Sequence, residues 1–97
     1  MMRLKFSWDP EKEKTNQKKH GISFQEAQTV FHDEHGRIIH DPDHSEAEDR
    51  FILIGMSHIQ HILAVCRCYL SQETIIRIIS ARKATKNEQN QYGRLWT

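Results

Sequence analysis

Alternation of apolar and polar residues at the start of the chain predicts a strand, and the polar segment that follows predicts a helix. Apolar and polar side chains alternate over residues 2–8, as in a half-buried strand, and we expect this strand at a sheet edge. Asp9 followed by Pro10 is typical of a helix start, and Gly21 favours a left-handed cap at a helix end. The sequence therefore predicts a first helix over residues 10–20.

A capping box predicts a second helix. Ser23 and Glu26 have the spacing at which each side chain bonds the backbone N–H of the other, so the helix is expected to begin at Phe24. It is expected to end near His32, because turn-forming residues follow. Its apolar stripe comprises Phe24, Ala27, Val30 and Phe31.

The second half of the chain has the pattern of strands joined by turns and closed by a helix. Strands are expected over residues 37–40, 50–57, 62–70 and 74–84. A polar loop over residues 41–49 separates the first two strands and is expected to be the most mobile part. A hairpin turn over residues 58–61 and a further turn over residues 71–73 separate the others. Thr85 and Glu88 form another capping box, which opens a C-terminal helix.

This order of elements predicts an α+β fold. Two N-terminal helices precede an antiparallel four-stranded meander sheet, with room for a short N-terminal edge strand, and a C-terminal helix ends the chain. The 97 residues are expected to form a single domain over residues 1–97, because a chain of this length buries only one modest core.

Composition narrows the function classes without selecting one. The formal net charge is +1, so affinity for nucleic acid would have to come from a local basic patch. The sequence contains no apolar leader and no membrane-spanning stretch, from which we expect a soluble, cytoplasmic protein. Cys66 and Cys68 lie two positions apart on a predicted strand, which is poor geometry for a disulfide, so both are expected to stay reduced.

The strand predicted over residues 74–84 carries two arginines among β-branched residues. Because side chains alternate along a strand with period two, Arg77 and Arg82 are expected on opposite faces. Arg82 stands at the strand end, where it can reach outward, and we interpret it as an anion contact. Arg77 lies among isoleucines, where an unpaired charge is costly, so it is either a paired structural ion or a second contact.

Further cations lie on the neighbouring predicted strands. Arg50, Arg67 and Lys83 join the two arginines on three successive strands, where a phosphate backbone could lie across the sheet. Glu48 and Arg50 point to the same side if their strand extends back, which makes either a surface ion pair or an acid beside an anion-binding arginine. Arg67 either pairs inward with a carboxylate such as Glu48 or Glu88, or its face opens into a groove.

Residues on the first and last helices have both a structural and a functional interpretation. Lys12, Lys18 and Lys19 form either a solvated face or a basic surface. Glu88 is most economically the capping-box acid, and Tyr92 is most economically a packing residue with a polar tip.

Seven histidines raise the question of a metal site. Two pairs, His32 with His35 and His58 with His61, have H-x-x-H spacing, but neither is joined by a cysteine or carboxylate at a familiar metal-site spacing. We therefore interpret these histidines as solvated loop residues and assign no metal.

A set of ordered motifs runs over nearly the whole chain. It comprises Phe6-Ser7-Trp8-Asp9, Lys12, Asn16, Lys19-His20-Gly21, Phe24, Glu26-Ala27, Val30-Phe31, Glu48, Arg50, Gly55, Arg77-Ile78-Ile79-Ser80-Ala81-Arg82, Ala84, Glu88 and Tyr92. This order resembles the BrnT family of bacterial type II toxins. The resemblance implies a RelE/ParE-like fold, ribonuclease activity that inhibits translation, and neutralisation by a BrnA-type antitoxin. The ribbon-helix-helix domain of that antitoxin would bind the DNA, so no direct reading of DNA is expected from this chain. No membrane partner is expected either, since the sequence has no membrane-spanning stretch.

The resemblance implies metal-independent RNA cleavage with no cofactor. A base frees the 2′-hydroxyl to attack the adjacent phosphate, which leaves a cyclic phosphate and a 5′-hydroxyl. Arginine side chains would hold the phosphate, and a histidine, carboxylate or phenol would move the proton. The candidates for catalysis are Arg82, Arg77, Arg50, Glu48, His20 and Tyr92. The candidates for RNA binding are Arg67, Lys83, Lys12 and Lys19.

Two other functions fit the same arginines. A non-catalytic protein-interaction module would bind an acidic partner through them and cleave nothing. A ParE-like gyrase poison would damage DNA without loss of RNA. Incubation with RNA in the presence of a chelator separates both from a metal-independent nuclease.

Overall fold

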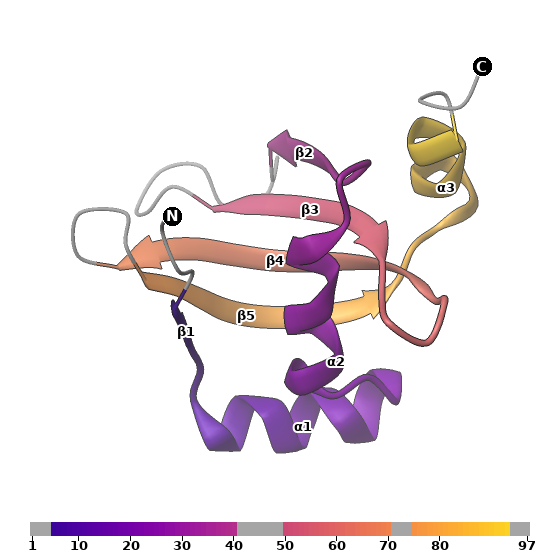
Figure 1. Cartoon of the computed structure of the whole chain (residues 1–97). Coiled ribbons are helices and arrows are strands. Elements are labelled where there is room, and N and C mark those ends of the chain that lie inside the picture. Colours follow the sequence, from indigo (N-terminus) through magenta and orange to yellow (C-terminus); the bar gives the residue numbers. More distant parts are fainter. Residues whose placement is uncertain (1–4, 41–49, 71–74, 94–97) are drawn as a thin grey trace.

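The computed structural model describes residues 5–40, 50–70 and 75–93. Its elements are β1 (Lys5–Ser7), α1 (Pro10–His20), α2 (Phe24–Thr29), a 3₁₀ turn η1 (Val30–His32), β2 (Arg37–His40), β3 (Phe51–Met56), β4 (Ile62–Leu70), β5 (Ile75–Lys83) and α3 (Lys86–Gly93) (Figure 1). Each predicted strand and helix is present among them. The start of the first predicted strand, the loop over residues 41–49 and the turn over residues 71–73 lie outside the described residues.

The strands form one five-stranded sheet in the order β1-β5-β4-β3-β2. From β2 to β5, successive strands are antiparallel neighbours, as the predicted meander requires. β1 pairs in parallel with β5, so the sheet is mixed and has one strand more than the predicted four (Figure 1). The prediction of a strand at a sheet edge is confirmed, since β1 is the first strand of the sheet. Its parallel pairing with β5 was not predicted, because alternation in a short segment indicates a strand but neither its partner nor its direction.

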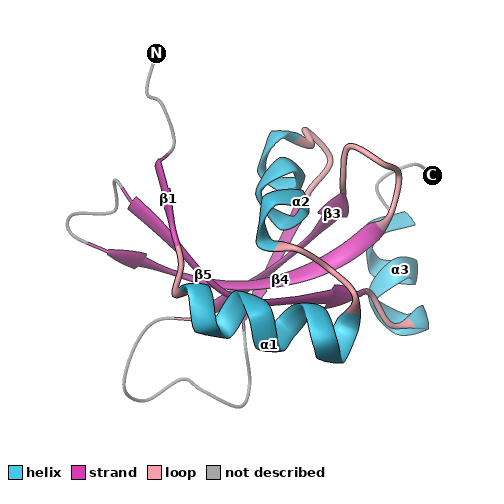
Figure 2. Ribbon diagram, turned by 90° about the horizontal axis from the view of Figure 1, so that it is seen from below, coloured by secondary structure: helices cyan, strands magenta, loops and turns pink. Residues whose placement is uncertain are grey.

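The two N-terminal helices pack on one face of the sheet, and α3 stands at one end (Figure 2). The core between the sheet and these helices is built around Phe24, Ala27 and Val30 of the second helix and its continuation, which are all fully buried. A smaller cluster joins Tyr92 and Ala84 to Ile54 on the other face. The sheet therefore has one covered face and one that α3 covers only in part.

The first helix is bounded by the predicted caps. The Asp9 side chain accepts a hydrogen bond from the Glu11 N–H, and Gly21 adopts the left-handed conformation with φ 73°. Asn16 is the one buried residue of α1. Its side-chain nitrogen donates to the carbonyls of Ile22 and Ala81, at 2.9 and 2.8 Å, and its oxygen accepts from the Ala81 N–H at 3.1 Å. The helix is thus fixed to β5 by a buried amide.

Only one of the two hydrogen bonds of the predicted capping box forms at the start of the second helix. The Ser23 hydroxyl accepts from the Glu26 N–H at 3.0 Å, as predicted. The Glu26 carboxylate does not complete the capping box: it accepts from the Ser57 hydroxyl at 2.7 Å and lies 2.9 Å from Nδ1 of His61. Tertiary partners on the β3–β4 turn therefore replaced the local bond, and they tie the helix to that turn.

The C-terminal helix begins with the full predicted capping box. Thr85 N–H donates to the Glu88 carboxylate at 2.8 Å, and Glu88 N–H donates to the Thr85 hydroxyl at 3.2 Å. Across the described part of the chain, no helix is long and apolar enough to cross a membrane.

Candidate functional site

A bulge in β5 brings Arg77 and Arg82 onto the same face of the sheet. The register with β4 shifts between Ile78 and Ser80, which leaves Ile79 as an extra residue of β5. An extra residue moves the alternation on by one position. The prediction that the two arginines occupy opposite faces is therefore wrong, because strict period two holds only in a strand without a bulge.

We call the surface that carries Arg77, Ser80 and Arg82 the arginine face. These residues alternate with the buried Ile78 and Ala81, which belong to the core beneath α1 and α2. The arginine face is thus the one that those helices leave open. Arg77 and Arg82 are half-buried and pair with β4 residues four positions apart, which separates them by about 13 Å along the strand.

Arg82 is held by α3. Its two terminal nitrogens lie 2.7 and 3.0 Å from the two carboxylate oxygens of Glu88, and its side chain remains 36 % exposed. The guanidinium of Arg82 is the main reason that the pKa of Glu88 is lowered, with burial opposing and the Thr85 N–H adding to the effect. Glu88 therefore stays ionised and orients Arg82, whose side chain is still partly open to solvent.

Arg50 and Lys83, two other predicted site residues, differ in their position relative to these arginines. Arg50 is half-buried and immediately precedes β3, where the register puts it level with Arg77. Lys83 follows Arg82, is exposed, and by alternation points to the other side of the sheet. Glu48 lies outside the described residues.

A basic groove runs between α1 and the free edge of β5. β1 pairs only with the first three residues of β5, so beyond Arg77 this edge faces α1 instead of a strand. The groove has a volume of ≈ 320 Å³ and is lined by Glu11, Lys12, Thr15, Asn16, Lys19, His20, Ile79 and Ser80. Because Ser80 also belongs to the arginine face, the groove that Lys12, Lys19 and His20 line reaches the edge of that face.

Arg67 does not join the arginine face. It pairs with Ile78 and lies on the covered face of the sheet, where only 3 % of it is exposed. Its guanidinium carbon lies 5.5, 5.7 and 4.7 Å from the ring centroids of Phe31, Phe51 and Tyr69. Of the two alternatives for Arg67, an inward pair with a carboxylate is not found among the described residues: its Nε and Nη1 are buried and have no hydrogen-bond partner there.

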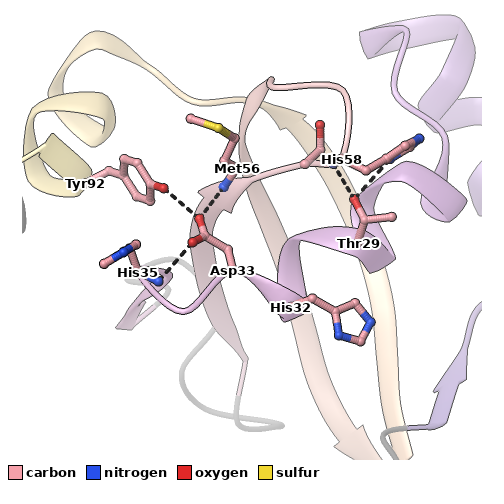
Figure 3. Close-up of a pocket in the computed structure, with 8 residues that line it drawn as sticks. Thr29, His32, Asp33, His35, Met56, His58 and Tyr92 are labelled. Carbon is pink, nitrogen blue, oxygen red and sulfur yellow. Dashed lines mark hydrogen bonds between the residues drawn. The ribbon is translucent and has the colours of Figure 1, made fainter.

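Tyr92 is held by Asp33 beside a second cavity. The Tyr92 hydroxyl donates to Asp33 at 2.7 Å, and the same carboxylate accepts from the backbone N–H groups of Met56 and His35, at 2.8 and 2.9 Å (Figure 3). This cavity of ≈ 540 Å³ is lined by Thr29, His32, Asp33, His35, Met56, Ser57, His58 and Tyr92. Tyr92 thus faces a different cavity from the basic groove.

The two groups shift each other's titration. Burial and then the bond to Asp33 raise the pKa of Tyr92 to about 12. Burial by itself raises the pKa of Asp33, but the hydrogen bonds from Met56, Tyr92 and His35 outweigh it, so that this pKa is lowered. At neutral pH the phenol is a hydrogen-bond donor and the carboxylate is ionised. Asp33 was not predicted, because the sequence marks it only as a turn residue.

The structure also bears on metal binding and on the cysteines. Over the described residues, no group of three or more His, Cys, Asp or Glu side chains is arranged to hold a metal ion. Cys66 and Cys68 are both in the reduced form, as predicted.

The fold and the site together define a small α+β domain with a mixed sheet, one face of which carries two arginines. The sequence model of the family described as "Ribonuclease toxin, BrnT, of type II toxin-antitoxin system" matches residues 8–88. The chain therefore belongs to the BrnT family of ribonuclease toxins. Comparison with curated proteins gives no significant match.

A solved structure of another BrnT toxin has a fold similar to that of this chain. The 1.1 Å crystal structure of the Brucella abortus ribonuclease toxin BrnT superimposes on this chain with a TM-score of 0.65 and 24 % sequence identity. The alignment covers 87 % of this chain and 100 % of the Brucella chain. The likeness therefore extends over the helices and the mixed sheet.

Proposed function

We propose that this protein cleaves RNA on the arginine face without a metal ion, and that the cleavage inhibits translation. The observation that carries the proposal is the pair Arg77 and Arg82 on one open face, with Arg82 oriented by Glu88. Fixed guanidinium groups bind a phosphate and stabilise the extra negative charge that develops as it is attacked. A RelE/ParE-like fold and neutralisation by a BrnA-type antitoxin with a ribbon-helix-helix domain are further parts of this proposal, and family membership supports them.

The reaction is an internal transesterification. A base removes the proton of the 2′-hydroxyl, the freed oxygen attacks the adjacent phosphorus, and the bond to the 5′-oxygen breaks. An acid returns a proton to that oxygen, so the products are a 2′,3′-cyclic phosphate and a 5′-hydroxyl. Arg82 holds the attacked phosphate, while Arg77 and Arg50, level with each other and about 13 Å further along the strands, contact a flanking phosphate.

We assign proton transfer to His20. The acid–base candidates are His20, Glu48 and Tyr92. Among the described residues, His20 is the candidate that lines the groove with Ser80, at the edge of the arginine face. The Tyr92 hydroxyl is occupied by Asp33, and its pKa of about 12 keeps it protonated at neutral pH, so it cannot serve as the base.

The RNA strand on either side of the scissile bond follows the basic groove. Lys12 and Lys19 are exposed on α1 and line this groove. Their ammonium groups act as point charges for flanking phosphates. Lys14 and Lys18 lie on the same helix but do not line the groove, which makes them matched controls.

The test is incubation of purified protein with RNA in excess chelator. We expect cleavage by the wild type with cyclic phosphate ends, and loss of about 10²–10³-fold in rate for Arg82→Ala. Arg82→Ala also leaves the Glu88 carboxylate without its ion-pair partner, which could itself lower the rate. The double variant Arg82→Ala/Glu88→Gln removes that charge, so the same loss of rate in the double variant assigns the effect to Arg82. Lys12→Ala/Lys19→Ala should weaken RNA binding, whereas Lys14→Ala/Lys18→Ala should not.

Other outcomes would select another function. Absence of cleavage of both free and ribosome-bound RNA would favour the interaction module. Induction of DNA damage in cells without loss of RNA would favour a gyrase poison. Cleavage that disappears in chelator and returns with a divalent metal would overturn the metal-independent mechanism.

A further inference from the structure

The guanidinium of Arg67 is buried without the partners that a buried cation requires. Only 3 % of the residue is exposed, and neither Nε nor Nη1 has a hydrogen-bond partner within the described part of the chain. Buried donors are nearly always satisfied in proteins, so each exception calls for an explanation. Three aromatic rings around the guanidinium compensate the charge in part but accept no conventional hydrogen bond.

The rings around Arg67 are partly open to solvent. Tyr69 is 41 % exposed, while Phe31, Phe51 and Phe6 are half-buried. Phe6 packs edge-on against Phe31, with ring centroids 5.0 Å apart. We call these four rings and Arg67 the Arg67 surface. An arginine among tyrosine and phenylalanine side chains is the composition of an interface hot spot.

The Arg67 surface is separate from the arginine face. Arg67 and Tyr69 alternate with Cys66 and Cys68 along β4, so the two surfaces lie on opposite sides of the sheet. A ligand that occupies one therefore does not directly cover the other.

We propose that the Arg67 surface is the docking site of the antitoxin, which inserts a carboxylate flanked by apolar side chains. The inference rests on the proposed toxin function, since a toxin of this class implies an antitoxin partner. A carboxylate supplies the missing acceptors, and its hydrogen bonds to a guanidinium are strong in an apolar surround. The flanking apolar groups cover Tyr69 and its neighbours.

The single charge at this surface favours a protein over RNA as the occupant. A phosphodiester strand brings a series of charges that apolar rings cannot solvate, whereas one carboxylate matches one guanidinium. The exposed cations suited to several phosphates, Lys12 and Lys19, line the groove on α1. RNA binding at Arg67 is nevertheless measured in the test.

The test uses separately purified cognate antitoxin and three toxin variants. Arg67→Met removes the charge at similar length, and Tyr69→Ala removes an exposed ring with little effect on the core. Ile59→Ala is the control, because Ile59 is 52 % exposed and lies in the β3–β4 turn at the other end of the strands. We expect at least about 30-fold weaker antitoxin binding for the first two and no change for the control.

Two further measurements separate this role from a structural one. Arg67→Met should keep or raise the Tm of the free toxin, because it removes an unsatisfied buried charge, while a structural arginine would lower it. Both variants should cleave RNA and bind an uncleavable 2′-O-methyl RNA as the wild type does, yet escape neutralisation.

The inference is overturned if both variants bind antitoxin with wild-type affinity, or if they lose RNA binding and keep antitoxin binding. Failure of the docking proposal can be distinguished from failure of the proposed nuclease function. A wild type that cleaves no RNA would refute the nuclease, while the antitoxin affinities of the variants would still decide the docking site.

Discussion

Arg82 at the end of β5 and Glu88 in the first turn of α3 form a two-pronged ion pair, with nitrogen–oxygen distances of 2.7 and 3.0 Å. The same carboxylate caps the helix through the Thr85 N–H. One side chain therefore fixes both the start of α3 and the direction of the guanidinium. Because of this shared role, changes at Glu88 should affect stability and RNA cleavage together.

Glu88→Gln should make stability less dependent on pH in the acid range. The pKa of Glu88 is lowered in the folded state, so its carboxylate contributes stability above its ordinary value near 4.5, and this contribution is lost as the pH falls through the lowered value. We expect a loss of about 1–2 kcal/mol at pH 7 that shrinks towards pH 3. Urea unfolding of both proteins from pH 3 to 7 measures it, and a constant difference would contradict the assignment.

Tyr92→Phe should destabilise the protein and leave cleavage nearly intact. The variant loses the hydrogen bond to the ionised Asp33, which is worth roughly 1.5–2 kcal/mol. RNA cleavage should stay within a few-fold of the wild type, because the hydroxyl is engaged by Asp33. A loss of a hundredfold would instead restore Tyr92 to the catalytic set.

The titration of Tyr92 gives an independent check. Its pKa is raised from 10.0 to about 12, so its contribution to stability is complete below pH 10 and is lost as the pH rises through about 12. The difference in absorbance at 295 nm between wild type and Tyr92→Phe should show one phenol that ionises near pH 12. Ionisation near pH 10 would contradict the bond to Asp33.

Arg77→Ala should remove one phosphate contact. On a single strand each contact contributes about 0.7 to the slope of log K against log salt concentration, so the slope should fall by about that amount. Binding of a 2′-O-methyl RNA at several salt concentrations measures the slope. Lys14→Ala is the control and should leave it unchanged, since Lys14 lies outside the groove. Equal slopes for wild type and Arg77→Ala would mean that Arg77 is a structural residue.

Asn16→Ala should cost roughly 3 kcal/mol of unfolding free energy. The substitution leaves the Ala81 N–H and two backbone carbonyls without the amide that bonds them, in a place where only 6 % of Asn16 is exposed. Gln17→Ala, at an exposed position on the same helix, should cost a few tenths of a kcal/mol. Denaturant unfolding compares them, and equal losses would rule out the buried amide as an anchor.

Local chemistry explains why most elements could be predicted. Asp9, Gly21 and Thr85 act on backbone groups within a few residues of themselves, so their effect can be derived from the sequence. Glu26 shows the limit of that reasoning. Its spacing from Ser23 predicted a local bond, yet Ser57 and His61 lie close enough in the folded chain to take the carboxylate.

The candidate site was predictable as a set of residues but not as an arrangement. Nothing in the sequence marks Ile79 as a bulge, since the register that creates it depends on β4. Arg67 and Arg82 both lie in predicted strands among apolar residues. In the folded chain, Arg67 is buried among aromatic rings on the covered face, whereas Arg82 lies on the arginine face. The role of Asp33 depends on Tyr92, which is 59 residues away.

The sequence by itself determined where helices begin and end, which segments are strands, and which cations are available, because caps and periodicity act over a few residues. The tertiary structure alone decided which faces those cations occupy. Sheet register, the parallel pairing of β1 with β5 and the bulge at Ile79 are set by contacts between distant segments. These contacts put Arg77 and Arg82 on the same face of the sheet and bury Arg67 on the other side.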